Sequence, residues 1–240
     1  MDQVRRTKRQ GESPGERART GILDAAEDLF ARQGPSAVTL RSIATAADVN
    51  VAAVNYYFGS KEKLFEEMFL RRVIPLNDER LAQLAACLAR VNVKTTLADI
   101  VTAYVMPALR LADAASARAI IVQYSLGRVL AMPEVNQMLV RYYARVREAF
   151  VAALQDALPH LSPQEVVWRY YWMGGSLMVT LAVPSGMVEA ANDGIVTMGH
   201  AASNRLSATL VAFLVHGISA PAGTTIAIPG STVAVGPDGQ

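Results

Sequence analysis

Apolar residues recur every three to four positions along most of the chain, which is the spacing that places them on one face of an α-helix. The sequence lacks alternating strand patterns and internal repeats. The apolar positions of the first long segment, 16–33, are Ile22, Ala25, Ala26, Leu29 and Phe30. Gly34 follows this segment as a natural helix end. We therefore predict an all-α fold with a first helix at 16–33.

Residues 39–63, TLRSIATAADVNVAAVNYYFGSKEK, predict two short helices and the start of a third. The apolar face of the short helices consists of Ile43, Ala44 and Ala47 before a break and of Val51 and Val54 after it. Only residues 48–50 separate the two helices, and so short a connection forces a sharp crossing. This pattern is typical of a helix-turn-helix, whose second helix enters the major groove of DNA. The small Ala52 and Ala53 would let that helix approach the bases closely.

Three polar residues predict the helix N-termini in this stretch, because a short side-chain oxygen can accept a backbone N–H that the first turn leaves unpaired. We expect Thr39 to cap the first short helix, Asn50 the second and Ser60 the third helix. The third helix should kink or end at Pro75, since proline lacks the N–H that continues the ladder. The junction between two domains is therefore expected near 72–77.

The remainder of the chain predicts helices at 76–90, from Thr96 past Pro107, and at 117–132, 134–158, 163–183 and 194–216. Thr96 with Asp99 forms an approximate capping box, and Ser162 with Glu165 forms a stronger one. The expected division is a disordered basic arm at 1–15, a helix-turn-helix DNA-binding domain at 16–75, a C-terminal helical bundle for dimerisation and ligand binding at 76–219, and a flexible tail at 220–240.

Composition supports helices packed on helices, because 52% of residues are hydrophobic and only 7% are aromatic. The single cysteine, Cys87, excludes an internal disulfide framework and a multi-cysteine zinc site, and it suits a reducing cytoplasm. The N-terminus has no apolar core, so no secretory signal is expected. Residues 170–188 carry no charge. Pro184 should end the helix there, so an interface helix explains this segment better than a membrane span.

The formal net charge of +2 does not by itself indicate a nucleic-acid partner, but its distribution is informative. Residues 1–20 contain six basic and three acidic side chains. Such a segment can be a solvated tail. Directly before a DNA-binding domain, it is also suited to contact phosphates.

The stretch from Arg19 to Phe69 resembles the DNA-binding domain of the TetR family of transcriptional regulators. The motifs that carry the resemblance are Ile22-Leu23-Asp24-Ala25-Ala26, Leu29-Phe30, Gly34, Thr39 with Ile43-Ala44, and Val54-Asn55-Tyr56-Tyr57-Phe58 followed by Ser60-Lys61. Asp48 stands where the family usually has glycine, although aspartate tolerates the left-handed conformation. Asn55 stands where an aromatic residue is common, which predicts an unusual base preference.

The resemblance implies a set of DNA contacts. Arg41 would reach a base edge, Val51, Ala52, Ala53 and Asn55 would face the bases, and Thr39, Tyr56, Tyr57 and Lys61 would contact phosphates. Asn50 is a further hydrogen-bonding candidate, and Asn55 could bind adenine through its N6 and N7 atoms. Tyr57, next to Phe58, could instead close the small core. No convincing catalytic set, metal site or cofactor motif is found, so an enzyme on a helical bundle is not favoured.

An aromatic and methionine-rich middle is the candidate ligand cavity. Its proposed lining is Tyr104, Met106, Tyr124, Arg128, Tyr142 and Trp172, with Tyr143, Trp168 and Met173 as further candidates. Ordinary core packing is the alternative for each of these residues. Arg118 or Arg128 could meet a ligand carboxylate. The stretch from Pro159-His160-Leu161 through Trp168, with the later Phe213-Leu214-Val215, is similar to PsrA-type, fatty-acid-responsive members of the family. This resemblance implies a small apolar ligand such as a fatty acid or acyl-CoA.

The function expected from these features is a ligand-responsive repressor that binds a palindromic operator in double-stranded DNA as a homodimer. The dimer interface is expected on the helices at 163–183 and 194–216. The apolar stripe of the second helix is Ile195, Met198, Ala202, Leu206, Leu210 and Phe213. A ligand-independent architectural DNA-binding protein is the alternative, and it would bind DNA broadly without a preferred site.

Overall fold

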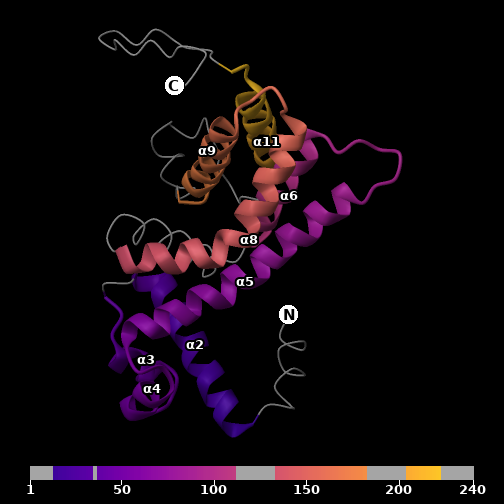
Figure 1. Cartoon of the computed structure of the whole chain (residues 1–240). Helices are drawn as coiled ribbons and strands as arrows, with labels where there is room; N and C mark the ends of the chain where they lie inside the picture. Colours follow the sequence, from indigo (N-terminus) through magenta and orange to yellow (C-terminus); the bar gives the residue numbers. More distant parts are fainter. Residues whose placement is uncertain (1–12, 35–36, 112–132, 183–203, 223–240) are drawn as a thin grey trace, which may run out of the picture. The chain divides into compact units, whose positions relative to one another are not determined.

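The computed structural model describes residues 13–34, 37–111, 133–182 and 204–222, and for 133–140 and Asn204 only the backbone. Every regular element in these ranges is an α-helix, which confirms the all-α prediction (Figure 1). The helices are α2 (Pro14–Gln33), α3 (Leu40–Ala46), α4 (Val51–Phe58), α5 (Lys61–Leu88), α6 (Leu97–Leu111), α8 (Pro133–Ala157), α9 (Pro163–Ala182) and α11 (Asn204–Ser219). The chain forms two compact units, residues 1–76 with 111–138, and residues 77–110 with 139–240.

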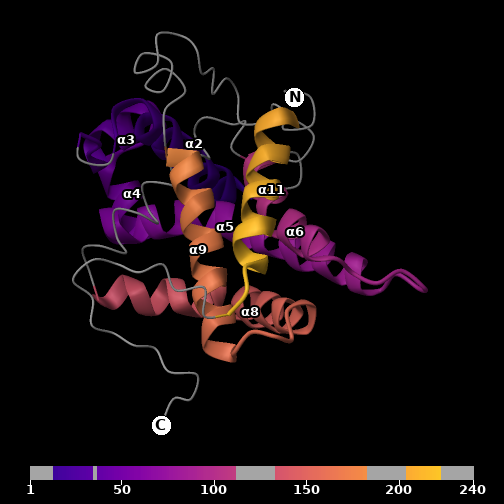
Figure 2. The same cartoon turned by 90° about the horizontal axis from the view of Figure 1, so that it is seen from above.

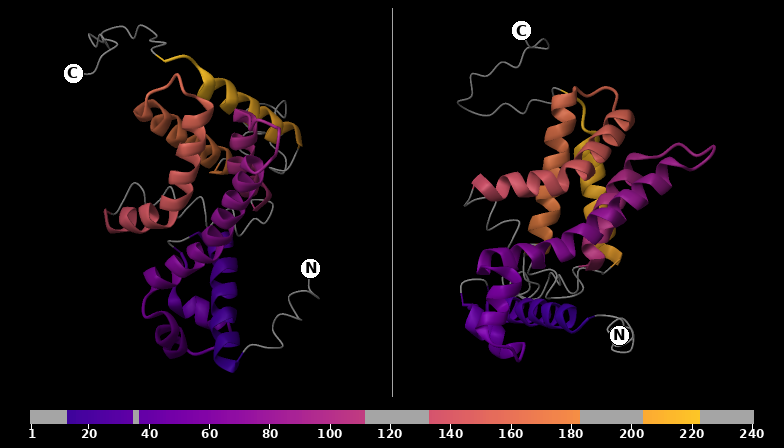
Figure 3. Two further views of the ribbon diagram at one scale, coloured as in Figure 1. Left: turned by 45° about the vertical axis from the view of Figure 1, so that its right-hand side comes forward. Right: turned by 60° about the horizontal axis from the view of Figure 1, so that its bottom comes forward.

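In the first unit, α2, α3 and α4 gather around the N-terminal part of α5 (Figure 3). The apolar positions that the sequence pattern placed on one face of α2 supply its share of the core. Fully or nearly fully buried side chains of this core include Ile22, Phe30, Ile43, Val54, Phe58, Leu64 and Phe69. The rings of Phe30 and Phe65 meet edge to face with their centroids 5.2 Å apart, which ties α2 to α5.

Capping side chains define the helix ends of the first unit, as the sequence predicted for three of them. Thr39 accepts the N–H of Ser42 at 3.0 Å, Asn50 that of Ala53 at 2.7 Å, and Ser60 that of Lys63 at 3.2 Å. The start of α2 differs from the prediction. Ser13 caps it in a capping box with Glu16, so the helix begins at Pro14 and not at residue 16. Residues 13–15 therefore belong to the helix and its cap, and the expected arm is too long by three residues.

The helix does not end at Pro75, one of the two outcomes predicted there, because α5 runs from Lys61 to Leu88. A proline inside a helix removes its own N–H bond and crowds the carbonyl four residues earlier, a cost that packing can offset. On either side of Pro75, Val73 and Leu76 are buried at 0% and 3% exposure, and this packing stabilises the continuous helix. The boundary between the two units lies between Leu76 and Asn77, inside this continuous helix.

The second unit contains the rest of α5 together with α6, α9, α11 and most of α8. The predicted capping boxes are confirmed, with Thr96 accepting the N–H of Asp99 and Ser162 that of Glu165. Hydrogen bonds from Arg90 and from Thr96 lower the pKa of Asp99 to about 2. The predicted helix at 117–132 lies outside the described residues.

Helices α9 and α11 lie side by side (Figure 2). The expected end of α11 at Gly217 is wrong, because the helix continues to Ser219. A buried arginine accounts for the longer helix. The Arg169 guanidinium, on α9, donates to the carbonyls of Ile218 at 2.6 Å and Ala220 at 2.5 Å, and so satisfies acceptors that the helix end leaves unpaired. Within the described ranges, no helix has the length and apolar character needed to cross a membrane.

Candidate nucleic-acid interface

Helices α3 and α4 are joined by a tight turn, Ala47–Asn50, which is one residue longer than expected. Asp48 adopts the left-handed conformation with φ of 54°, as the sequence predicted for this position. The backbone N–H of Val49 donates to the carbonyl of Ala44 at 3.0 Å, which folds the chain back on α3. The two helices and their turn therefore form the expected helix-turn-helix.

Helix α4 has one buried and one exposed face. Val54 and Phe58 are 1% and 4% exposed and anchor α4 in the core. Ala52, Asn55 and Tyr56 are exposed, Tyr56 at 84%. Residues expected to face the bases are thus accessible on a helix that the core holds rigidly. An exposed face of small and hydrogen-bonding residues suits contact with base edges in a major groove.

Two predicted contact residues already use their side chains within the protein. The Thr39 hydroxyl takes part in the capping box of α3, and the Asn50 Oδ1 atom accepts the N–H of Ala53. The amide NH₂ of Asn50 is then the part suited to contact DNA. Arg41 and Val51 are exposed and Ala53 is half-buried, near the starts of α3 and α4. The DNA contacts of these residues stay predictions.

Tyr57 and Lys61 each pack against the core beside the exposed face. The Tyr57 ring lies 5.2 Å from that of Tyr56 and 6.4 Å from that of Phe58 between centroids. A Cβ atom on Gly15 would lie 3.4 Å from the Tyr57 hydroxyl, so this tyrosine reaches the start of α2. The Lys61 ammonium lies 5.3 Å from the centroid of Phe65. A role for Tyr57 in closing the core is therefore compatible with a phosphate contact through its hydroxyl.

The structure also reveals a buried ionic cluster that the sequence analysis missed. Glu27 is 4% exposed, and its carboxylate accepts hydrogen bonds from Arg72, one of them at 3.2 Å from Nε. Arg71 lies 3.7 Å from the same carboxylate and 2.8 Å from Asp24. The sequence did contain a signal for this cluster, because Glu27 follows Leu23 by four residues and so falls on the apolar face of α2. An acidic residue on a buried face needs a cationic partner.

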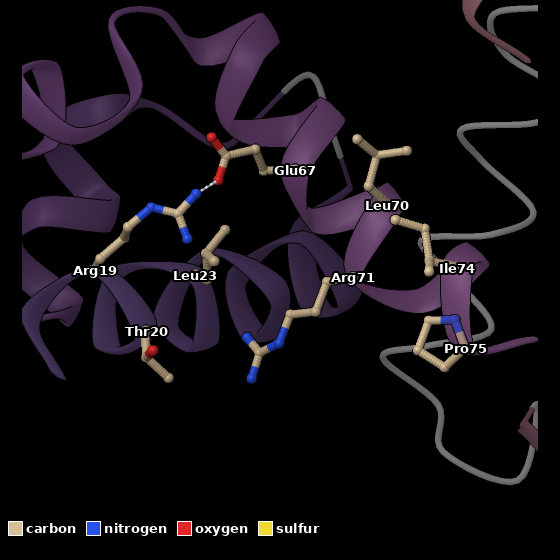
Figure 4. Close-up of a pocket in the computed structure, with 8 residues that line it drawn as sticks. All are labelled: Arg19, Thr20, Leu23, Glu67, Leu70, Arg71, Ile74 and Pro75. Atoms are coloured by element: carbon tan, nitrogen blue, oxygen red, sulfur yellow. Dashed lines mark hydrogen bonds and ion pairs between the residues drawn. The ribbon is translucent and has the colours of Figure 1, made fainter. Parts of the chain in front are cut away.

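Arg19 provides a second link between α2 and α5. Its guanidinium lies 5.2 Å from the centroid of Phe58 and pairs with Glu67 (Figure 4). An open groove between α2 and α5 is lined by Arg19, Thr20, Leu23, Glu67, Leu70, Arg71, Ile74 and Pro75. Both arginines of this groove have acidic partners, so its charges are balanced within the protein.

The predicted ligand residues of the second unit fall into two groups. Tyr104 and Met173 are buried, while Met106, Tyr142 and Tyr143 are half-buried. The Tyr104 ring packs edge to face against Phe150 and Tyr170, at 5.2 and 5.6 Å between centroids. The exposed group consists of Trp168 and Trp172, at 48% and 63%. Trp172 therefore lies on the surface of α9 and not in an enclosed cavity, since the turn of the helix directs Met173 inward instead.

Three further candidates, Arg118, Tyr124 and Arg128, lie outside the described residues. Within the described part of the chain, no group of three or more histidine, cysteine, aspartate or glutamate side chains could hold a metal ion.

Two family models match this chain, in the order of the two units. The model of bacterial regulatory proteins of the tetR family matches residues 22–68, which include the helix-turn-helix. The model of the tetracyclin repressor-like C-terminal domain matches residues 102–217. The chain belongs to the tetR family of regulatory proteins.

Sequence similarity to curated HTH-type regulators extends over about a fifth of this chain. The HTH-type transcriptional repressor Rv3405c of Mycobacterium tuberculosis is 45% identical over 49 residues, which is 20% of this chain and 26% of that protein. The match therefore spans about a quarter of the relative's length.

Solved structures of the tetR family share the fold over most of the chain. A TetR family transcription regulator from Marinobacter aquaeolei VT8 superposes with a TM-score of 0.60 at 15% identity, over 84% of this chain and 95% of that one. The fatty acid degradation regulator FadR from Bacillus halodurans gives a TM-score of 0.57 at 18% identity, over 87% and 96%. At this identity the likeness establishes the tetR fold alone.

Proposed function

We propose that this tetR-family chain is a transcriptional repressor that binds a palindromic operator as a homodimer and responds to a small ligand. The observation that carries the proposal is the exposed face of α4, on which Asn55 and Tyr56 project from a helix anchored by Val54 and Phe58. A rigid helix with an accessible polar face suits base readout. The family model that covers this same segment, residues 22–68, is that of bacterial regulatory proteins of the tetR family.

Selection of bound sequences from random double-stranded DNA tests this function. A repressor of this kind should enrich one palindrome, with half-sites spaced to place two copies of α4 in successive major grooves, roughly 34–36 Å apart. The alternative, a ligand-independent architectural protein, would bind broadly and enrich no site. A ligand would act by a population shift, favouring dimers whose two α4 helices no longer match that spacing.

Fatty acids and acyl-CoA thioesters are the ligand classes we propose for the second unit. Support comes from its buried aromatic and methionine side chains, including Tyr104 and Met173. This chain also shares its fold with a fatty acid degradation regulator, which is compatible with these ligand classes.

Replacement of Asn55 by alanine should weaken binding to the selected palindrome by about 1–3 kcal/mol and leave binding to scrambled DNA nearly unchanged. Lys61→Ala is the matched comparison, because a lost phosphate contact weakens both DNAs alike and reduces the salt slope by about one unit. Binding titrations at several salt concentrations measure both effects. Equal losses on both DNAs for Asn55→Ala would show that Asn55 does not read a base.

Deletion of residues 1–12 should leave the fold intact and lower DNA affinity, more at low salt than at high salt, because basic side chains on phosphates act through screened charge. Deletion of residues 1–15 is the comparison. It also removes the Ser13 cap of α2, which should cost about a further 1 kcal/mol of stability. Unchanged affinity of the shorter deletion at low salt would assign residues 1–12 no role in binding.

The surface that we propose for dimerisation is an aromatic stripe on α9. Its exposed members are Trp168, Tyr171, Trp172 and Val179, which follow helical spacing. Gly175 is exposed in the same stripe, and Phe213 of α11 is 67% exposed. Large aromatic side chains left in water mark protein interfaces. A two-fold dimer also supplies the second α4 that a palindrome needs.

A further inference from the structure

Arg80, in the part of α5 that belongs to the second unit, is a buried cation without a carboxylate partner among the described residues. Its side chain is 3% exposed. Other arginines of this unit differ in having a carboxylate partner, for example Arg110 with Glu79 and Arg90 with Asp99. A buried charge is costly unless an opposite charge or several hydrogen bonds compensate it. The surroundings of Arg80 therefore need a separate explanation.

The hydrogen bonds and the ring contact of the guanidinium within the described residues are all to neutral groups. Its Nε–H donates to the carbonyl of Tyr104 at 2.9 Å, and one terminal nitrogen donates to the Asn77 side chain at 3.4 Å. Its central carbon lies 4.1 Å from the centroid of the Tyr104 ring. A guanidinium has five N–H donors, so these contacts leave donor capacity and the whole positive charge for a further partner.

Two tyrosine side chains interact with this cation, Tyr104 through its ring and Tyr170 through its charge-sensitive hydroxyl. Burial raises the pKa of Tyr170 well above its ordinary value, and the Tyr104 side chain, with which Tyr170 is hydrogen-bonded, adds to the rise, while the charge of Arg80 opposes it. Tyr170 is therefore a neutral phenol, and its hydrogen bond with Tyr104 uses one of the two O–H donors and leaves the other for a further acceptor. A Cβ atom at Gly174 would lie 3.3 Å from the Tyr104 hydroxyl. Glycine at this position thus lets the Tyr104 hydroxyl pack closely against α9.

We propose that Arg80, with the hydroxyls of Tyr104 and Tyr170, binds the carboxylate of a small monocarboxylic acid in the second unit. One buried positive charge is balanced by one carboxylate, and the planar fork of arginine matches its two oxygens. The proposal rests on the proposed ligand response and narrows it, because an acyl-CoA thioester has no free carboxylate and brings several negative phosphates.

Arg80 is also placed to influence the other unit through its own helix. Asn77, its hydrogen-bond partner, donates to the carbonyl of Tyr142 at 3.2 Å, so α5 is tied to α8 at this point. The same helix carries Arg72, the partner of Glu27 in the first unit. A carboxylate bound to Arg80 therefore contacts α5, the helix that both units share.

The test uses the full-length chain and a straight-chain series, acetate, hexanoate and decanoate, each beside its primary amide, with decanoyl-CoA as a further probe. Thermal unfolding reports binding. At ten times its Kd, the best carboxylate should raise the Tm by about 3–5 °C, and its amide should not. Arg80→Met should weaken this binding roughly 10- to 100-fold. Arg110→Met, an exposed arginine of the same unit, should leave it unchanged.

Arg80→Lys keeps the charge without the planar fork and should bind with intermediate affinity, which provides a readout if Arg80→Met does not fold. Equal carboxylate responses of wild type and the Arg80 variants, or no response to any carboxylate in the series, would overturn the proposal. Tighter binding of decanoyl-CoA than of decanoate would overturn the choice of the free acid. Operator binding is measured separately without any probe, so failure of the DNA-binding function is distinguished from failure of this site.

Discussion

Replacement of Glu27 by alanine is expected to destabilise the first unit by about 3 kcal/mol, the lower end of what the loss of one partner of a buried ion pair costs. Glu27 is 4% exposed and pairs with Arg72, whose side chain is 23% exposed. The variant leaves that guanidinium, and Arg71 beside it, without the shared carboxylate. Because Arg72 retains some access to water, the larger values in the usual range are not expected.

Hydrogen exchange measures this effect in each unit separately. Backbone amides in α2 and α4 should exchange roughly a hundredfold faster in Glu27→Ala, since 1.36 kcal/mol corresponds to a factor of ten. Amides in α9 should change little. Asp28→Ala is the matched control, because its neighbouring carboxylate pairs with Arg32 at the surface, where such a pair contributes about 0–1 kcal/mol. Similar exchange in the two variants would show that the buried cluster contributes no special stability.

The local features of the fold were predictable because they depend on residues close in sequence. The N-caps Thr39, Asn50 and Ser60 each act on an N–H three residues away, so their geometry needs no knowledge of the rest of the chain. Asp48 was predictable for the same reason, since a left-handed turn is a property of a single residue. The buried face of α4 was predicted only in part, because Val54 is buried whereas Val51, which the sequence pattern placed on the same face, is 37% exposed.

Features that depend on packing between distant segments were not predictable. Pro75 gives a strong local signal for a break, yet buried neighbours on both sides carry α5 past it. The continuation of α11 beyond Gly217 depends on Arg169, which is more than forty residues earlier in the chain. In both cases a contact that the sequence pattern does not encode outweighed a preference of about 1–3 kcal/mol at one residue.

The candidate site likewise has features that depend on local sequence, which were predictable, and features that depend on packing, which were not. Exposure of Asn55 and Tyr56 follows from the helical period once Val54 and Phe58 are placed inside. For the second unit, the composition indicated that aromatic residues could line a cavity. It did not predict which of these side chains point inward. Trp172 and Met173 are neighbours in sequence, yet one is 63% exposed and the other fully buried. The sequence did not show that the hydrogen-bond partners of Arg80 are neutral, because they are known only from the structure.

The surface position of Trp172 makes it a sharper probe of the proposed dimer than Leu206. Leu206 is half-buried within the chain, so a charge there would disturb folding as well as association. Trp172 is 63% exposed, and a charge at that position meets water when the chain is monomeric. A substitution at Trp172 therefore separates assembly from folding.

Trp172→Glu is expected to convert the dimer to monomers and to abolish operator binding at nanomolar protein concentrations. A two-fold interface contains the residue twice, and loss of a buried aromatic anchor costs about 2 kcal/mol or more per copy. The dimer dissociation constant should therefore rise roughly a thousandfold, which sedimentation analysis can measure. Trp172→Phe should keep most of the association, and Val91→Glu, in the exposed loop before α6, should change nothing. A folded Trp172→Glu protein that still sediments as a dimer and binds the palindrome would place the interface on other helices.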